Sequence, residues 1–150
     1  MYQRILVPLE NSRADRAILD HVTTLARHDN ASVVLIHVAD GFAARNLKQL
    51  ALRESEEMRR DRAYLDDIAA RLAGAGLKVD AILATGDPTT EITAAAEREG
   101  CDLIAMGTHG HRWALDLLFG SVAEAVRQRT LVPVLVVRQQ AADEIGRAHV

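Results

Sequence analysis

The sequence has one cysteine, three prolines and few aromatic residues, and these shortages exclude whole classes of protein. A lone Cys101 cannot form an internal disulfide, so the chain is not a disulfide-stapled domain. We expect this cysteine to be buried or half-buried, because no histidine or lysine stands beside it to activate the thiol. Aromatic residues make up 3% of the chain, whereas 49% of it is hydrophobic, mostly Ala, Leu and Val. This composition favours helices packed on a sheet over an aromatic-rich β-barrel.

The chain also lacks an excess of basic residues and any long apolar run. Its formal net charge is −3, whereas binding to nucleic acid needs Lys and Arg clustered on one face. No apolar stretch approaches the roughly 18 residues of a membrane span, and residues 1–20 do not have the architecture of a signal peptide. We therefore expect a cytoplasmic protein with no nucleic-acid partner and no membrane partner.

Five short apolar runs rich in β-branched residues predict five strands. Four of these runs are nearly continuous in apolar residues, as in a parallel sheet whose two faces are both covered by helices. Helical patterns lie between the runs. The 150 residues therefore predict a single α/β domain, an open, doubly wound, five-stranded parallel sheet with four helices. The predicted strands are residues 4–9, 32–38, 79–84, 102–107 and 133–138.

Capping patterns indicate where three of the helices begin. Ser12 and Asp15 resemble a capping box, which predicts a first helix directly after the first strand. The third helix has Pro88 in its first turn, where proline is favoured. The fourth helix is predicted to start at Ser121.

Two polar segments flank these patterns. Residues 40–57 are charged and precede a second helix that is predicted to end at Gly74. We expect this segment to be mobile or partly helical, either as a lid over a pocket or as a solvated helix face. Residues 139–150 have no strong period and predict a loose C-terminal tail, which leaves residues 1–138 as the domain.

The loop after the fourth predicted strand carries the clearest chemical pattern. It reads Gly-Thr-His-Gly at residues 107–110 and Gly-Ser-Val at 120–122, that is, G-x2-G-x9-G-S between a strand and a helix. Ligands of open α/β sheets bind at the carboxyl ends of strands. Glycines let main-chain N–H groups approach an anion, and a helix start offers N–H groups without partners. The pattern therefore predicts a phosphate site, with further donors from Thr108, Ser121, His109, His111 and Arg112.

The same residues have two other interpretations that the sequence leaves open. Ser121 with Glu124 is itself a capping box, and the glycines can turn the chain without binding anything. His109 and His111 form an H-x-H pair able to ligate a metal, although no Cys, Asp or Glu stands at the customary ligand spacing. Because no set of nucleophile and base is recognisable, we assign no catalytic residue.

Several motifs taken together resemble the universal stress protein family. The resemblance covers residues 1–138 and is carried, in chain order, by Ile5–Leu9, Leu35–Val38, Gly86–Pro88, Asp102–Gly110 and Leu117–Ala123. It implies a Rossmann-like sheet of the adenine nucleotide alpha hydrolase-like type. In that family G-x2-G-x9-G-S/T marks the ATP-binding branch, so the resemblance implies an ATP-binding regulatory or stress-protection protein, with ADP or AMP as other candidate ligands.

The resemblance also implies which residues surround the nucleotide. Glu10 would lie near the ribose, the phosphates or a Mg²⁺ ion that bridges phosphate oxygens. The adenine site would be lined by Pro8, Leu9, Val38 and Met106. The phosphates and ribose would be surrounded by Gly107, Thr108, Gly110, Gly120, Ser121 and Val122, with His109 and Arg112 as neighbours.

Three places depart from the family pattern. An aspartate followed by glycine is typical where this chain has Glu10 and Asn11, Trp113 replaces an often small residue, and Asp116 replaces a common basic one. An added acid and a bulky ring near a triphosphate would weaken its binding. Two alternatives therefore stay open: a dimeric interaction protein with a degenerate, non-binding pocket, and a slow ATPase.

The last predicted strand is strongly apolar and is expected at a sheet edge, where an exposed strand invites pairing. The resemblance implies that it pairs with its two-fold mate in an isologous homodimer. The interface residues would be Val134, Leu135, Val136 and Val137. No protein partner, stress or pathway is identified by the sequence.

Overall fold

The structure, a computed structural model, describes residues 1–40, 50–109 and 116–139. Strands and helices alternate along these residues, and all strand pairs are parallel, in the order β3-β2-β1-β4-β5. The predicted fold class is thereby confirmed. The elements are β1 (Arg4–Pro8), α1 (Asp15–Asp29), β2 (Ser32–Asp40), α2 (Leu50–Gly74), β3 (Val79–Gly86), α3 (Pro88–Arg98), β4 (Leu103–His109), α4 (Asp116–Arg129) and β5 (Val134–Gln139).

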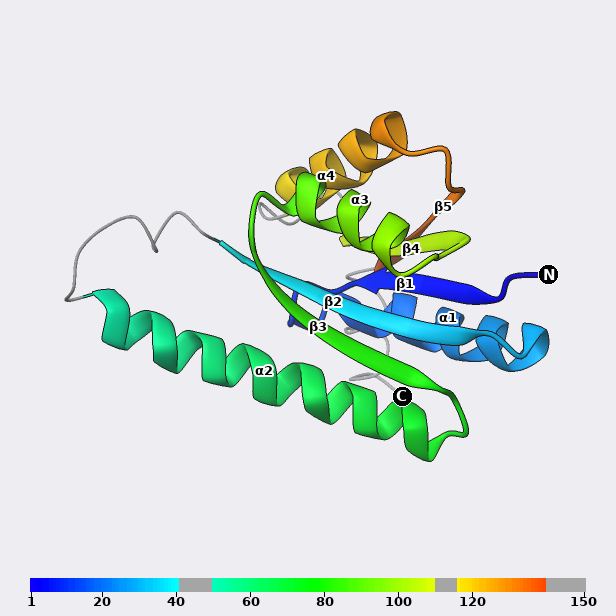
Figure 1. The fold of residues 1–150 in the computed structure, drawn as a ribbon, viewed down its shortest axis with the longest axis horizontal. Coiled ribbons are helices and arrows are strands. Elements are labelled where there is room, and N and C mark those ends of the chain that lie inside the picture. The colour runs from blue at the N-terminus through cyan, green and yellow to red at the C-terminus, as the bar shows by residue number, and fades with distance from the viewer. Residues whose placement is uncertain (41–49, 110–115, 140–150) are drawn as a thin grey trace, which may run out of the picture.

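Helices cover both faces of the sheet, with α1 and α2 on one face and α3 and α4 on the other (Figure 1). Successive residues of a strand point to opposite faces, so β1 contributes to two separate cores. Ile5 and Val7 pack on the α1 and α2 side, whereas Leu6 packs on the α3 and α4 side. This explains why the strands are continuously apolar rather than alternating.

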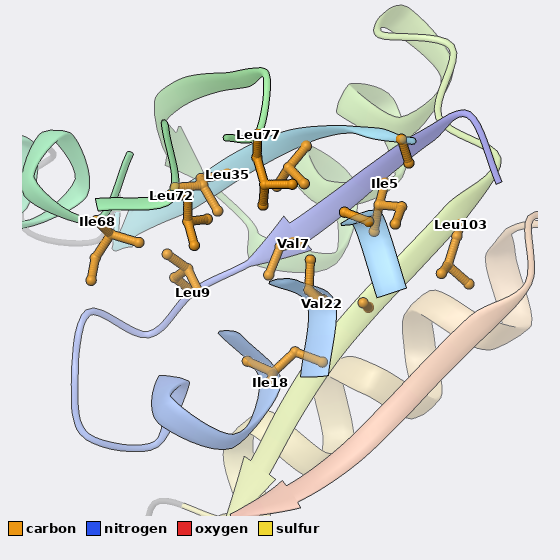
Figure 2. Packing of buried hydrophobic residues seen from close by; sticks show 14 of the residues in the cluster. Ile5, Val7, Leu9, Ile18, Val22, Leu35, Ile68, Leu72, Leu77 and Leu103 are labelled. Carbon is orange, nitrogen blue, oxygen red and sulfur yellow. The ribbon is translucent and has the colours of Figure 1, made fainter. Parts of the chain in front are cut away.

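The core under α1 and α2 is the larger of the two clusters (Figure 2). Ile18 and Val22 of α1 are fully buried against Val7 of β1, and Leu72 of α2 approaches Leu9 at the end of β1. Each fully buried aliphatic side chain of this size contributes about 1.5–3 kcal/mol. Leu9 therefore fixes the point at which the chain leaves the sheet.

The third helix begins as its capping pattern predicts, but the first begins two residues later than a capping box at Ser12 requires, because Ala14 occupies its N-cap position and no side chain caps it. The Asp15 carboxylate accepts the Ser12 N–H, which is one half of the predicted capping box, although the Ser12 hydroxyl accepts the N–H of Ala14 instead of that of Asp15. At the third helix the Asp87 carboxylate accepts the Thr90 N–H, and helix α3 begins at the following proline.

The fourth helix begins at Asp116, and the prediction of a start at Ser121 is wrong. Positions 119, 122, 123 and 126 are apolar at helical spacing, so the helical pattern already begins before Gly120. The Ser121 and Glu124 pair therefore lies inside the helix and does not cap it. Gly120 is tolerated there at a cost of about 1 kcal/mol relative to alanine.

Three further expectations have an outcome. Residues 50–57 of the charged segment belong to α2, so that segment is partly helical, while 41–49 lie outside the described residues.

β5 lies at a sheet edge as predicted, and it includes Gln139, which was predicted to belong to the tail. Gln139 is buried and its side-chain oxygen accepts the Ala17 N–H, whereas residues 140–150 lie outside the described part.

Within the described residues, no helix is both long enough and apolar enough to cross a membrane.

Candidate functional site

The strand order reverses between β1 and β4, which lie side by side in the centre of the sheet. From β1 the chain winds to β2 and β3 in one direction, and from β4 it winds to β5 in the other. A crevice opens at the carboxyl ends of the strands at such a switch point. Both loops in which the sequence predicts ligand contacts, after β1 and after β4, begin there.

A cavity of about 340 Å³, here called the switch-point cavity, lies at the carboxyl ends of β1 and β2. Its volume is within the range of small-molecule sites. Five residues predicted to contact a ligand line it: Pro8, Leu9, Glu10, Val38 and Val122. Sequence reasoning missed the other lining residues, Ser12, Ile36, His37, Pro88 and Ile92. The walls are mainly apolar, and Glu10 contributes the one carboxylate among the described lining residues.

A second cavity, of about 700 Å³, lies along α4 and β5 and is lined by three more of the predicted residues, Thr108, Gly120 and Ser121. The predicted contacts are thus divided between two cavities. The larger one is bounded by Val134 and Val136 of the edge strand and by charged residues of α4, including Glu124 and Arg127. We take the smaller cavity as the candidate base site, because its strand residues gather at the carboxyl ends of β1 and β2, whereas the larger cavity runs along β5 from Val134 to Arg138.

Met106 and Gly107 line neither cavity. Met106 is fully buried in the core under α3 and α4. A Cβ atom at Gly107 would lie 3.1 Å from the Ala14 carbonyl oxygen and 3.1 Å from Cγ2 of Ile18. The steric demand for glycine at 107 therefore comes from the close approach of α1 to β4.

The centre of the glycine-rich loop lies outside the described residues. Gly110, His111, Arg112 and Trp113 all fall in that gap. His109 is the last residue of β4. In the described part of the chain no group of three or more His, Cys, Asp or Glu side chains is arranged to hold a metal ion.

The lone cysteine lies outside both cavities. Cys101 is 6% exposed, and burial raises the pKa of its thiol to about 11. A buried, protonated thiol is a poor nucleophile.

A buried carboxylate holds the loop between β1 and α1. Asp15 is 3% exposed and accepts the main-chain N–H groups of Glu10 at 2.9 Å and Ser12 at 3.2 Å. Burial raises the pKa of Asp15 to about 6, and the hydrogen bonds from the loop partly oppose that shift. The main chain at Glu10 is thereby fixed, and its carboxylate accepts the Ser12 hydroxyl at 3.3 Å while the residue lines the cavity.

The same loop is fastened to α2 and β2 from its other side. Nδ1 of His37 donates to the Leu9 carbonyl at 2.8 Å, and Nε2 of the same ring lies 3.5 Å from a carboxylate oxygen of Asp61. The Asn11 side chain donates to the Asp61 carbonyl at 3.2 Å. Asn11 has φ = 60°, a left-handed conformation that asparagine tolerates better than most residues. These contacts link residues far apart in sequence, which is why no local pattern predicts them.

Comparison with known proteins identifies relatives over nearly the whole chain. A sequence model described as the universal stress protein family matches residues 1–138. Universal stress protein MJ0577 of Methanocaldococcus jannaschii is 32% identical over 157 residues, covering 93% of this chain and 97% of that protein. The solved structure of MJ0577 superposes with a TM-score of 0.84 and covers 94% of this chain and 99% of that one.

Two more distant solved structures share the fold and hold adenine nucleotides. One is a universal stress protein in complex with cAMP, with 20% identity, a TM-score of 0.66, and coverage of 91% of this chain and 97% of that one. The other is the universal stress protein of Archaeoglobus fulgidus in complex with dAMP, with 19% identity, a TM-score of 0.64, and coverage of 91% and 98%.

Proposed function

Because the chain belongs to the universal stress protein family, we propose that it is a nucleotide-responsive regulatory module that binds one adenine nucleotide, principally ATP, in the switch-point cavity. The cAMP and dAMP complexes of the two distant relatives support an adenine nucleotide as the ligand class. ADP and AMP are the alternatives within that class.

One observation carries the proposal: an apolar wall and a carboxylate meet in a single cavity at the carboxyl ends of β1 and β2. Adenine is flat and largely apolar at its faces, so Pro8, Leu9 and Val38 would hold it. Met106, which is buried beneath the surface, would support this wall without lining it. Glu10 would then face the ribose or a metal ion.

We assign the phosphates to the region where β4 ends and α4 begins. The first N–H groups of a helix have no acceptor inside the helix, and here they include those of residues 116–118. One turn further, a Cβ atom at Gly120 would meet no atom of the described residues within 4 Å, so we assign that side of the helix to the ligand. Val122 would lie between base and phosphates, and the remaining members of the proposed set are Gly107, Thr108, His109, Gly110, Arg112 and Ser121.

Mg²⁺ fits this donor set only as a companion of the phosphates. Glu10 is the one carboxylate that lines the switch-point cavity among the described residues. Mg²⁺ is commonly held by one or two carboxylates together with substrate phosphates. The protein would therefore bind Mg²⁺ through Glu10 when nucleotide is present, and the ion would neutralise phosphate charge there.

We further propose a cytoplasmic homodimer built from residues 1–138. β5 is an edge strand, and Val136 is 49% exposed. Pairing of this strand with its two-fold mate, through residues 134–137, would satisfy its outer main-chain groups and cover the valine.

A second function is favoured by the position of Asp116. Asp116 is the first residue of α4, in the segment to which we assign the phosphates, and it is acidic where the family commonly has a basic residue. If this charge outweighs the helix dipole, the protein is a dimeric interaction module that does not bind nucleotide. Slow ATP hydrolysis is a third possibility that requires binding first.

Calorimetric titration of nucleotide-stripped protein with ATP, with and without Mg²⁺, tests the proposal. Saturable binding near one ATP per chain is the expected result. No heat at high micromolar protein would reject the nucleotide-responsive module and favour the interaction module.

A further inference from the structure

A groove of about 620 Å³ runs between α1 and α2, on the face of the sheet opposite α3 and α4. Its residues extend from Ser12 to Thr23 on one side and from Tyr64 to Ala75 on the other. At a rise of 1.5 Å per residue, each side is about 16 Å long. The groove is thus a built feature of the molecule, comparable in volume with small-molecule sites.

The rim of the groove is basic although the chain is acidic overall. Arg13 and Arg16 come from the α1 side and Arg71 from α2, whereas Asp20 is the one acidic residue among the described lining. The formal net charge of the chain is −3, so this concentration of arginine reverses the average charge of the protein. Such a reversal attracts anions.

The side chains of two of these arginines have no ion-pair or hydrogen-bond partner in the described part of the chain. Arg16 and Arg71 are exposed and make no ion pair or hydrogen bond there, although Asp20 follows Arg16 by one turn. By contrast, Arg62 on the outer side of α2 pairs with Asp66 at 3.7 Å. The guanidinium groups of Arg16 and Arg71 are therefore available to an external partner.

The hydroxyl groups of the groove are already committed. Tyr64 donates to the Ser12 carbonyl at 3.2 Å, and Thr23 donates to the Leu19 carbonyl at 2.7 Å. The arginines are therefore the principal donors that the groove offers. A guanidinium is a planar fork that matches phosphate oxygens in pairs, and arginines on two facing helices match more than one anionic group.

We propose that the α1–α2 groove is a second ligand site, which binds a small molecule carrying two or more phosphate groups through Arg16 and Arg71, with Arg13 beside them. The site is separate from the switch-point cavity and does not depend on the nucleotide proposal. Ser12 lines both cavities, so a ligand in the groove would contact the loop that presents Glu10.

Tripolyphosphate is the probe that tests this site. It is titrated into isotope-labelled protein while the side-chain Nε–H signals of the arginines are followed by NMR, and Arg16→Gln and Arg71→Gln identify their own signals. We expect saturable shifts of these two signals and at least fivefold weaker binding in each variant. Arg59→Gln is the matched control, because Arg59 is exposed on α2 outside the groove and the substitution removes the same charge; its binding should change less than twofold.

Two results would overturn the proposal. Equal shifts of all exposed arginines, or equal weakening by Arg59→Gln, would show only general attraction to positive charge. Shifts confined to the amides of Val38 and Val122, with affinity unchanged in Arg16→Gln and Arg71→Gln, would place tripolyphosphate in the switch-point cavity. ATP also carries phosphates, so the calorimetric titration is repeated on the double variant Arg16→Gln with Arg71→Gln. Heat that survives in the double variant reports the switch-point cavity, and heat lost in it reports the groove, so the two proposals fail independently.

Discussion

The carboxylate of Asp15, the first residue of α1, accepts at 2.9 Å the main-chain N–H of Glu10, which belongs to the loop that lines the switch-point cavity. The same carboxylate also accepts the Ser12 N–H. The loop thus directs two main-chain N–H groups at one anion, and that anion is the Asp15 side chain. The main-chain N–H groups of Glu10 and Ser12 are therefore already used and not available to phosphate. What the loop offers to a ligand is the Glu10 side chain, which makes a contact with ribose or metal more consistent than a direct contact with phosphate.

The buried Asp15 predicts that stability depends on pH. Its pKa is about 6 in the folded protein against an ordinary value of 3.8, so between these values the folded protein holds a proton that the unfolded chain releases. The free energy of unfolding should therefore fall as pH rises through this window and level off above about pH 6. The contribution is at most roughly 3 kcal/mol. Urea unfolding at pH 4.5 and pH 7 measures it.

Asp15→Asn supplies the control, because asparagine does not titrate. The change in unfolding free energy between the two pH values should be smaller in this variant than in the wild type. An identical change in both proteins would assign the pH dependence to other groups.

Asn11 predicts a second stability effect at the same loop. Asn11→Ala places a Cβ-bearing residue without a polar side chain at φ = 60° and removes the hydrogen bond to Asp61, so it should destabilise the fold by about 1–2 kcal/mol. Asn11→Gly removes the same hydrogen bond but relieves the backbone, so its loss should be smaller. Chemical denaturation of both variants tests this order, and equal losses would show that backbone strain at this position is unimportant.

The fold could be predicted from the sequence because its signals are local. Continuous apolar strands, and a helix that begins at Pro88, depend on neighbouring residues alone. The predicted start of α4 was wrong because it too was based on a local pattern. Ser121 and Glu124 have the spacing of a cap, but the apolar positions before Gly120 extend the helix back to Asp116.

The candidate site could be predicted only in part. Glu10, Val38 and Val122 were expected, and they do line one cavity. The contact of His37 with Asp61 was not expected, because 24 residues of sequence separate them and only the packing of α2 beside β2 brings them together. Gly107 was expected to contact the phosphates, but the structure gives it a packing role. A Cβ atom at this position would lie only 3.1 Å from Cγ2 of Ile18 in α1.

Two substitutions of Gly120 distinguish its effect on helix stability from its effect on ATP binding. A Cβ atom there meets no atom within 4 Å in the part of the chain that the structure describes, so Gly120→Ala should stabilise the protein by about 0.5–1 kcal/mol through helix propensity. Gly120→Val should fold cooperatively but abolish ATP binding, because its branched side chain fills the space assigned to the phosphates. Thermal melts and calorimetry on both variants test this. Normal ATP affinity in Gly120→Val would remove the phosphates from this side of α4.

The proposed role of Glu10 predicts that its contribution to ATP affinity depends on Mg²⁺. Glu10→Ala should weaken Mg²⁺-ATP more than metal-free ATP, because only the first complex would use the carboxylate as a ligand. Glu10→Gln keeps the length of the side chain and loses the charge, so it should resemble the alanine variant. Calorimetry with and without Mg²⁺ measures both, and equal losses in the two conditions would argue against a metal-linked role.

The exposed edge strand predicts the route of dimerisation. Val136 is 49% exposed in the single chain, so a lysine is tolerated there without disturbing a core, but in a two-fold strand pair it would bring two positive charges into one interface. Val136→Lys should therefore give a monomer or an aggregate in size-exclusion chromatography with light scattering, while the wild type is a dimer. Leu131→Lys is the matched control, because Leu131 is fully exposed just before β5 and the change adds the same charge. A dimer that persists in Val136→Lys, with the melting temperature of the wild type, would show that the subunits associate through another surface.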